Sequence, residues 1–280
     1  MRDSDKAIRE AATIIADAAA LLVCAGAGMG VDSGLPDFRG AEGFWNAYPP
    51  YRELGLDFYD LANPEWFSRD PELAWGFYGH RLELYRRAVP HLGFALLRGW
   101  AEAKPGGYFV FTSNVDGQFQ KAGFAEERIH ECHGSIHHLQ CAAGCSGPVW
   151  PVAAAAVPVD VRTMRARPPL PDCPFCGRLA RPNVLMFGDW NWQPQRGREQ
   201  ALRLRHWLEA TEGKKLAVIE CGAGMAVPSV RHMSERLLAR PGTKLVRINT
   251  NEAGVPAGQI GLAGGALAML EAIAALIPAR

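Results

Sequence analysis

The sequence has no uninterrupted apolar run of about 18 residues, which excludes an ordinary membrane-spanning helix. It also lacks an excess of charge of either sign, because 30 Lys and Arg residues stand against 29 Asp and Glu residues. That balance removes the simplest reason to expect a nucleic-acid or membrane-surface protein, although it leaves room for a local basic patch. The N-terminal segment lacks the basic end, apolar centre and cleavage site of a secretory signal, so we expect a cytoplasmic protein.

The chain also lacks the even number of cysteines that is typical of a disulfide framework, because it has seven. Four of them form two close pairs, Cys141 with Cys145 and Cys173 with Cys176, separated by 27 residues. This spacing matches a four-thiolate zinc site, and a full tetrahedral shell would make the zinc structural. Surface cysteines that bind no metal are the alternative. The other three are expected to be small buried residues in strand-like segments: Cys24, Cys132 and Cys221.

The residues that are present favour a globular α/β protein. Apolar residues make up 48% of the chain and charged residues 21%, which suits a sizeable core. Short apolar runs alternate with amphipathic segments, so we expect a Rossmann-like parallel sheet with helices between its strands. The expected strands are a run from residue 20 into the glycines at 26–28, then 107–114, 183–187, 215–222 and 243–249. The expected helices are 5–20, 91–101 and 265–277.

Composition divides the chain into three parts. We expect the Rossmann-like domain to comprise residues 1–40, 91–135 and 182–280. Residues 41–90 are rich in aromatic residues and helix formers, and they predict a helical module. Residues 136–181 hold the cysteine pairs and predict a small zinc-binding module. We interpret the following aromatic residues as core of the helical module rather than a ligand cage: Phe58, Trp66, Phe67, Trp75 and Phe77.

Polar or glycine-rich segments follow several predicted strands, and such segments meet at one edge of a parallel sheet. The segments are 26–40, 112–118, 222–228 and 249–252. In the first, Gly26, Ala27 and Gly28 let the backbone approach a diphosphate, although the pattern is not the usual G-x-G-x-x-G. A structural tight turn is the alternative. In the second, Asn114 and Asp116 suit a polar ligand, or they only form a turn.

A histidine followed by glycine and serine, His133, can act as a general base, since imidazole titrates near neutral pH. A histidine-rich metal site is the alternative here, because four histidines lie within nine residues: His130, His133, His137 and His138.

Together these motifs resemble those of the sirtuins, the family of NAD-dependent protein-lysine deacylases. The matching segments appear in the family's order from about residue 20 to residue 250. They are GAGMG and SGLPDFRG within 26–40, TSNVDG at 112–117, HGS at 133–135, the cysteine pairs, RPNVLMFG at 181–188 and IN at 248–249. The resemblance implies an NAD-binding Rossmann-like domain, one structural zinc ion and an acylated protein as substrate. We expect a monomer, with no nucleic-acid or membrane partner.

The resemblance implies a role for each matching residue. His133 would be the catalytic base, beside Asn114 and Asp116 at the nicotinamide-ribose end of NAD. The residues that would bind NAD are Gly26, Ala27, Gly28, Asp37, Phe38, Arg39, Ser113, Asn114, Asp116, Gly222, Gly224, Asn249 and Glu252. The substrate peptide would add as a strand between two loops and touch Phe187, Gly188 and Val227.

The implied chemistry begins with cleavage of the bond between nicotinamide and ribose. The acyl oxygen of a modified lysine attacks the resulting cation-like carbon. His133 then helps a ribose hydroxyl to lose its proton and to attack the acyl-imidate carbon. The products would be free lysine, nicotinamide and an O-acyl-ADP-ribose.

Three segments depart from the family pattern. Ser113 stands in the place of the usual glutamine, and Asp189 replaces the glutamate after Phe187-Gly188. Residues 222–228 keep only the glycine and the Val-Pro of the usual loop. Because two of these segments flank the substrate peptide in sirtuins, a second hypothesis is transfer of ADP-ribose to a protein, or hydrolysis of NAD. A non-enzymatic NAD sensor or scaffold is a third.

Tyr78 and Arg81 resemble the Tyr-x-x-Arg of sirtuins that remove succinyl or malonyl groups, where the pair binds the distal carboxylate of the acyl chain. A buried arginine requires an anionic partner, which agrees with this role. The alternatives are an exposed pair one helical turn apart, or an arginine that binds a phosphate or a peptide carboxylate. We interpret the arginine-rich stretch 196–205 as a solvated helix face, with a basic binding patch as the alternative.

Overall fold

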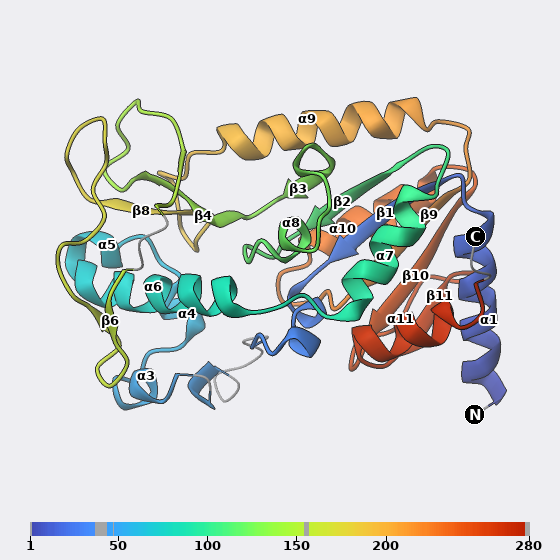
Figure 1. The fold of residues 1–280 in the computed structure, drawn as a ribbon, viewed down its shortest axis with the longest axis horizontal. Helices are drawn as coiled ribbons and strands as arrows, with labels where there is room; N and C mark the ends of the chain where they lie inside the picture. The colour runs from blue at the N-terminus through green and yellow to red at the C-terminus, as the bar shows by residue number, and fades with distance from the viewer. Residues whose placement is uncertain (1, 37–43, 47, 154–156, 278–280) are drawn as a thin grey trace.

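The computed structural model describes residues 2–36, 44–46, 48–153 and 157–277. At its centre lies a six-stranded parallel sheet in the order β11-β10-β9-β1-β2-β3 (Figure 1). The strands are β1 (Ala20–Ala25), β2 (Tyr108–Thr112), β3 (Ile129–Glu131), β9 (Leu216–Cys221), β10 (Thr243–Asn249) and β11 (Ile260–Ala263). The expected Rossmann-like sheet is confirmed. The sequence did not predict β3 and β11, because three or four residues are too few to show a pattern.

Helices cover both faces of this sheet. They are α1 (Arg2–Asp17), α7 (Leu92–Glu102) and α11 (Ala266–Ala274) on one face, and α9 (Gln195–Ala210) and α10 (Ser229–Arg236) on the other. Strand β1 is buried along its whole length, and its alternate side chains enter opposite layers. Leu21 and Val23 pack in the layer of α1, α7 and α11, whereas Leu22 and Cys24 pack in the layer of α9 and α10.

The region before α7 is helical, as expected, with α3 (Pro49–Glu53), α4 (Phe58–Leu61), α5 (Trp66–Arg69) and α6 (Pro71–Arg87). The predicted aromatic core is confirmed. Phe67, Trp75 and Phe77 are buried in one hydrophobic cluster, and Phe58 and Trp66 pack against it. Ile136, Leu139 and Ala180 belong to the same cluster, so the helical region and the cysteine-bearing region share a core.

A second sheet lies beside this helical region and contains β5 (Trp150–Pro151), β4 (Gly134–Cys141) and β8 (Ala180–Val184), in that order and antiparallel. The prediction that residues 183–187 form a strand of the large sheet was therefore wrong. The strand begins at Ala180 and pairs with β4, because the chain returns from the cysteine pairs along that strand. An apolar run alone does not distinguish a strand of a parallel sheet from one buried beneath a helix.

The remaining short elements connect these layers. They are the helices η1 (Ala27–Met29), η2 (Val31–Ser33), α8 (Gln118–Lys121), η3 (Glu126–Arg128) and η4 (Leu237–Ala239), and the strand pair β6 (Val159–Asp160) and β7 (Arg165–Ala166). Both termini lie at the end of the molecule away from the helical region (Figure 1). No helix in the described ranges is both long and apolar enough to cross a membrane.

The strand order sets the place of the candidate site. From β1 the chain adds β2 and β3 on one side of the sheet, and it later adds β9, β10 and β11 on the other. The order therefore reverses between β1 and β9. In open parallel sheets, ligands bind outside the carboxyl ends of the strands at such a switch point.

Candidate active site

Two glycine-containing turns meet at the switch point. The amide of Gly28 donates to the carbonyl of Gly222 over 3.0 Å. A Cβ atom added to Gly26 would lie 2.7 Å from Cα of Ala223, and one added to Gly222 would lie 2.3 Å from the backbone of Gly28. Gly222 also has a φ of +64°. The backbones of the turns after β1 and β9 therefore touch at positions where only glycine fits.

A small cavity of about 110 Å³ opens beside these turns. Three of the predicted NAD-binding residues line it: Gly28, Gly222 and Asn249. Val31, Asp32 and Thr250 also line it and lie in the segments 26–40 and 249–252 that were expected to meet here, although they were not singled out. The remaining lining residues escaped prediction: Ile248, Gly264, Gly265 and Ala266. Residues 264–266 follow β11, so a sequence pattern that misses this strand misses its loop as well.

Asn114 and Ser113 lie at the end of β2 and tie it to the first turn. The side-chain amide of Asn114 donates to the carbonyl of Gly26 over 3.0 Å, and the amide of Ser113 donates to the carbonyl of Ala25 over 3.1 Å. Asn249 is 2% exposed at the end of β10, where its amide donates to the carbonyl of Ala223 over 2.8 Å. Both asparagines thus hold the loops that line the crevice.

Asp116 is buried next to these residues, with 8% of its surface exposed. One carboxylate oxygen accepts a hydrogen bond from the amide of Gln118 over 2.9 Å. Burial raises the pKa of Asp116 to about 6, although the Gln118 amide and Arg81 oppose this rise. The carboxyl group therefore titrates unusually close to neutral pH.

His133 lies half-buried just after β3. Its Nε2 is 3.1 Å from Oγ of Ser229, at the start of α10. The ring also bonds to the backbone of Ser113, so we assign that contact to Nδ1–H, which donates to the carbonyl. Nε2 then remains the acceptor. Burial lowers the pKa of His133 more than this bond raises it, so the ring is neutral and able to accept a proton at neutral pH.

The other histidines near His133 do not form a metal cluster within the described part of the chain. Nε2 of His137 lies 2.9 Å from the carbonyl oxygen of Asp116. Burial lowers the pKa of His130 and of His138 to about 4, so both rings are neutral. The histidine-rich metal site is not supported.

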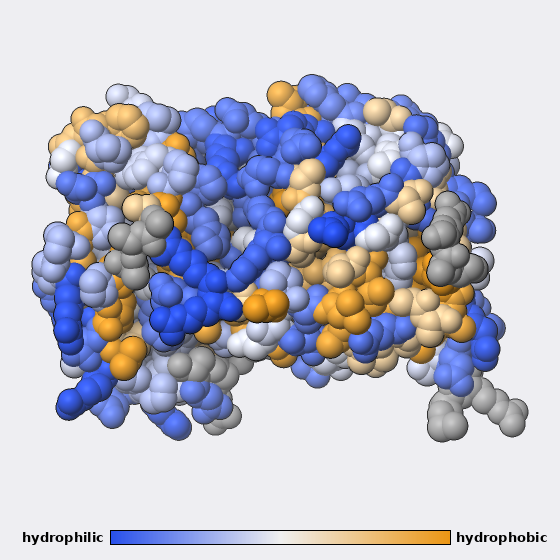
Figure 2. Space-filling view, viewed as in Figure 1, coloured by the Kyte–Doolittle hydropathy of each residue, from blue (hydrophilic) through white to orange (hydrophobic). Residues whose placement is uncertain are grey.

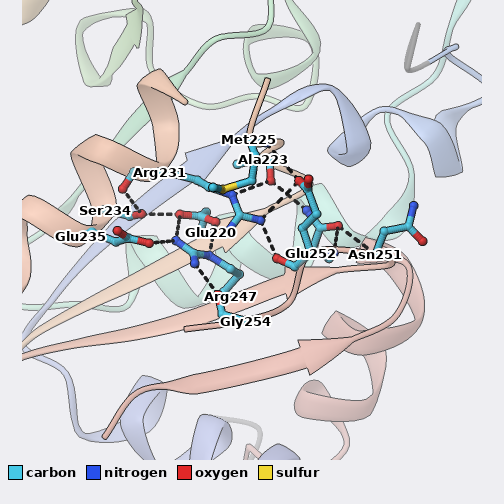
Figure 3. Close-up of polar contacts among 11 residues, drawn as sticks. Glu220, Ala223, Met225, Arg231, Ser234, Glu235, Arg247, Asn251, Glu252 and Gly254 are labelled. Atoms are coloured by element: carbon cyan, nitrogen blue, oxygen red, sulfur yellow. Dashed lines mark hydrogen bonds and ion pairs between the residues drawn. The ribbon is translucent and has the colours of Figure 1, made fainter. Parts of the chain in front are cut away.

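A buried polar network holds the loop after β9 (Figure 3). Arg231 on α10 is 5% exposed, and its Nε donates to the carbonyl of Ala223 over 3.1 Å. Its Nη2 lies 3.6 Å from the Glu252 carboxylate and also donates to the carbonyl of Glu252. The carboxylate of Glu252 accepts from the amide of Met225 over 3.0 Å. Arg231 and Glu252 therefore clamp the loops after β9 and β10 together.

Two further carboxylates, those of Glu220 and Glu235, bind Arg247 and join β9, β10 and α10 next to this loop (Figure 3). Arg247 on β10 donates to Glu220 on β9 and to Glu235 on α10, with the Glu235 contact at 2.8 Å. The side chains of Arg247 and Glu220 are 1% and 0% exposed. Ser234 also donates to Glu220. None of these residues was singled out from sequence, because each pairs with a partner that lies remote along the chain.

The four paired cysteines come together as predicted. Their sulfur atoms lie within 4.8 Å of one another, and the Cys141–Cys176 and Cys145–Cys173 separations are both 3.6 Å. Sulfur atoms at the corners of a zinc tetrahedron lie about 3.8 Å apart, whereas a disulfide would need about 2.05 Å. The backbone and side chain of Arg178 hold the pKa of Cys176 below its usual range, which favours the thiolate ligand. The donors suit one structural zinc ion.

Of the other three cysteines, Cys24 and Cys221 are buried as expected and Cys132 is half-buried. Burial raises the pKa of all three thiols, in Cys132 to about 12, so none is a reactive thiolate.

The two predicted peptide-flanking loops both expose apolar side chains. Phe187 is 39% exposed and Val227 41%, while Trp190 is 96% exposed. The Phe187 ring packs 4.9 Å from that of Tyr59. Asp189, which replaces the usual glutamate, forms a fully buried ion pair of 2.8 Å with Arg181. The loop around Gly188 is therefore anchored at its base while its apolar side chains face solvent.

Tyr78 and Arg81 are both buried on α6, at 1% and 5% exposure. The exposed-pair alternative is therefore wrong. The Arg81 guanidinium lies 5.8 Å from the Tyr78 ring centroid and donates to the hydroxyl of Tyr85 over 2.7 Å. Within the described part of the chain, the Tyr78 hydroxyl has no hydrogen-bond partner. The charge of Arg81 opposes the rise in the pKa of Asp116.

Three predicted NAD-binding residues, Asp37, Phe38 and Arg39, lie outside the described residues. Of the rest, Gly224 follows the clamped turn, where a Cβ would lie 3.7 Å from the Glu252 carboxylate. Ala27 begins η1 directly after Gly26.

Comparisons with known proteins agree with this geometry. The model of the Sir2 family matches residues 26–201. The chain is 34% identical over 186 residues to an NAD-dependent protein deacylase of Aeropyrum pernix, which covers 66% of each chain. It is 30% identical over 248 residues to one of Thermococcus kodakarensis, which covers 88% of this chain and 85% of the relative.

One solved structure, a mutant Sir2 homologue in complex with ADP-ribose, has a TM-score of 0.69 and 28% identity, with 95% of each chain covered. The alignments with several curated relatives span slightly less than two thirds of the relatives' length.

Proposed function

The chain belongs to the Sir2 family, and from this premise we propose that it removes acyl groups from protein lysine in an NAD-dependent reaction. The observation that carries the proposal is the place of His133. A neutral, half-buried imidazole follows β3 and bonds to the backbone of Ser113 after β2, with Nε2 as its acceptor atom. Asn114 and Asp116 follow Ser113 along the chain, where Asn114 bonds to the first glycine turn and Asp116 is buried.

The chain's own residues suit the steps that such a reaction requires. The glycines let the two turns pack against each other, and the cavity beside them, lined by Gly28 and Gly222, would receive a diphosphate. NAD, when bound, would supply the ADP-ribosyl group that receives the acyl group. Nε2 of His133 would take the proton of a ribose hydroxyl, and the Ser113 carbonyl would stabilise the resulting imidazolium through Nδ1–H. The exposed Phe187 and Val227 would border the acyl-lysine.

For the acyl group, we propose a chain with a distal carboxylate, such as succinyl or malonyl. A guanidinium that is 5% exposed and surrounded by aromatic rings offers a strong site for a carboxylate. The Tyr78 hydroxyl next to it is free of partners among the described residues and can donate a second hydrogen bond. Burial raises the pKa of Tyr78 to about 12, so this hydroxyl keeps its proton.

The first test is mass spectrometry of the purified protein with NAD and four matched peptides that carry acetyl-, succinyl-, malonyl- or unmodified lysine. We expect loss of the acyl mass and formation of nicotinamide and the matching O-acyl-ADP-ribose. A peptide or protein heavier by one ADP-ribose, or turnover of NAD without acyl loss, would favour the transferase or hydrolase hypothesis. NAD that is bound but never consumed would indicate a sensor.

The variant Arg81→Met tests the acyl preference separately. We expect kcat/KM for succinyl-lysine to fall by about 100-fold, because a charge-assisted bidentate pair contributes about 3 kcal/mol. Activity toward acetyl-lysine should change by less than about fivefold. A preference for acetyl-lysine in the unaltered protein, or an equal loss toward both substrates in the variant, would remove the acidic-acyl proposal and leave the deacylase proposal intact.

A further inference from the structure

A second cavity lies outside the nucleotide crevice, between α9 and α10. Its volume is about 380 Å³, more than three times that of the cavity at the glycine turns. Phe111 of β2, Leu204 of α9 and Met233 of α10 form its apolar floor, and all three are at least 92% buried. A groove of this size with an apolar floor is typical of a binding site rather than a packing gap.

The rim of this groove is basic. Arg205 and Arg236 line it and are exposed, as is His232, and no acidic residue is among its described lining residues. Helix α9 itself carries four arginines against two glutamates. The surface over α9 is mainly hydrophilic (Figure 2), which agrees with the predicted solvated face. The groove beneath that face thus combines apolar contact area with positive charge.

The arginines of α9 differ in what they contact. Arg196 pairs with Glu126 at 2.7 Å and also with Glu131, and Nε of Arg203 donates to the carbonyl of Glu127 over 3.2 Å. By contrast, Arg205 forms no ion pair with a carboxylate of the described chain. Among the described residues, Nη2 of Arg236 donates to the sulfur of Met233 at 3.1 Å and to no carboxylate. Two guanidinium groups at this rim are therefore available to an external anion.

One end of the groove reaches the candidate active site. Ser229 lines the groove, and its Oγ is 3.1 Å from Nε2 of His133. Val227, two residues before Ser229, is exposed on a loop that borders the proposed acyl-lysine. A polypeptide whose modified lysine lies against His133 would therefore have this groove next to it as it leaves the site.

We propose that the groove between α9 and α10 binds a flanking segment of the protein substrate that contains acidic and apolar residues. This inference rests on the proposed deacylase function. Apolar side chains of that segment would cover Phe111, Leu204 and Met233, and its carboxylates would pair with Arg205 and Arg236. The groove thus selects substrates by the sequence that surrounds the modified lysine.

The test uses peptides that share one acyl-lysine, with the acyl group that the protein removes fastest. The residues that follow the lysine are Leu-Glu-Leu-Glu, Leu-Gln-Leu-Gln or Leu-Lys-Leu-Lys, and a second set places them before it. In one set, we expect kcat/KM for the acidic peptide to exceed that for the neutral peptide by about tenfold in low salt, because each exposed ion pair contributes up to about 1 kcal/mol. The ratio should approach one in about 0.5 M salt.

The double variant Arg205→Glu/Arg236→Glu should invert this ratio, so that the basic peptide is preferred over the acidic one. Arg198→Glu is the matched control, because Arg198 is an exposed arginine of α9 that does not line the groove, and it should leave the ratio unchanged. Equal kcat/KM for acidic and neutral peptides in both sets, or an unchanged ratio in the double variant, would overturn the inference.

If no peptide lost its acyl group, the proposed function would fail and the groove would still be tested by binding. Fluorescence anisotropy with fluorescein-labelled forms of the same peptides measures affinity without catalysis. Tighter binding of the acidic peptide that the double variant abolishes would support the groove. Equal affinities would overturn it, as would displacement by decanoate with no preference among peptides, which would assign the groove to small anionic amphiphiles.

Discussion

At the scale of single residues, burial of the Asp116 carboxyl group makes the stability of the fold depend on pH. Burial raises its pKa to about 6, from an unfolded value near 3.9. Between these values the folded chain binds more protons than the unfolded chain, so the free energy of unfolding falls as pH rises from about 4 to about 6. Above pH 6 the buried carboxylate is ionised, and its burial lowers the free energy of unfolding by a constant amount.

We therefore expect Asp116→Asn to raise the free energy of unfolding at pH 7.5 by up to about 3 kcal/mol, and to change it little at pH 4. Asparagine keeps the oxygen that accepts from the Gln118 amide. Urea unfolding at both pH values measures this, with the exposed Glu209→Gln as a control. We expect the same variant to lose deacylase activity. If Asp116→Asn lowered the free energy of unfolding at pH 7.5, or raised it more at pH 4 than at pH 7.5, this account would be contradicted.

At the scale of elements, the crevice depends on loops that neighbouring elements hold in place. The turn after β9 is held by side chains from other elements. Arg231 of α10 donates a hydrogen bond to the carbonyl of Ala223 in this turn. Glu252, from the loop after β10, holds the Met225 amide and pairs with Arg231. The position of this loop is thus set by the helix that follows it and by the loop after β10.

We expect Arg231→Met to raise KM for NAD by about tenfold while kcat stays within about threefold. The substitution removes the hydrogen bonds of Arg231 to the carbonyls of Ala223 and Glu252 and its ion pair with Glu252, and so loosens a loop that does no chemistry. A tenfold rise in KM corresponds to a loss of about 1.4 kcal/mol in NAD binding. Steady-state kinetics at saturating peptide measures both constants, and Arg198→Met is the control. Arg231→Lys, which keeps the charge, should give an intermediate KM. A fall in kcat at unchanged KM would show that Arg231 does not act through the loop.

For the whole molecule, the four-cysteine cluster stabilises the part that lies beside the large sheet. Cys141 ends β4 and Cys145 follows it, whereas the other two ligands precede β8, and these strands pair with one another. The same region shares one hydrophobic cluster with the aromatic residues of α6. Beyond β8, the amide of Leu185 donates to the carbonyl of His133 over 2.9 Å. Loss of the metal would therefore loosen both the second sheet and His133, the proposed catalytic base.

We expect one zinc ion per chain by elemental analysis, and none in Cys173→Ser. Removal of zinc by a strong chelator should lower Tm by more than about 5 °C and abolish activity, because the binding energy of a structural metal adds directly to folding energy. Added zinc should restore both. Cys132→Ala, which alters a cysteine outside the cluster, should keep the metal. Full activity in a zinc-free chain would contradict a structural role for the site.

The sequence by itself determined the features that depend on neighbouring residues. Apolar runs placed β1, β2, β9 and β10, because a strand that is covered on both faces is apolar at most of its positions. Spacing placed the four cysteines, since metal-ligand pairs lie close together along the chain. Glycines after β1 and the polar residues after β2 marked the crevice, because the carboxyl ends of parallel strands share one edge.

Only the tertiary structure decided which distant residues meet. The strand expected at 183–187 belongs to the second sheet because its partner is β4, and the apolar run carries no record of that partner. The contact between His133 and Ser229 joins residues 96 positions apart, and the one between Arg165 and Asp70 spans 95. The groove between α9 and α10 exists only once both helices pack on the sheet. Local patterns follow from the period of a helix or strand, whereas such pairings follow from the packing of whole layers.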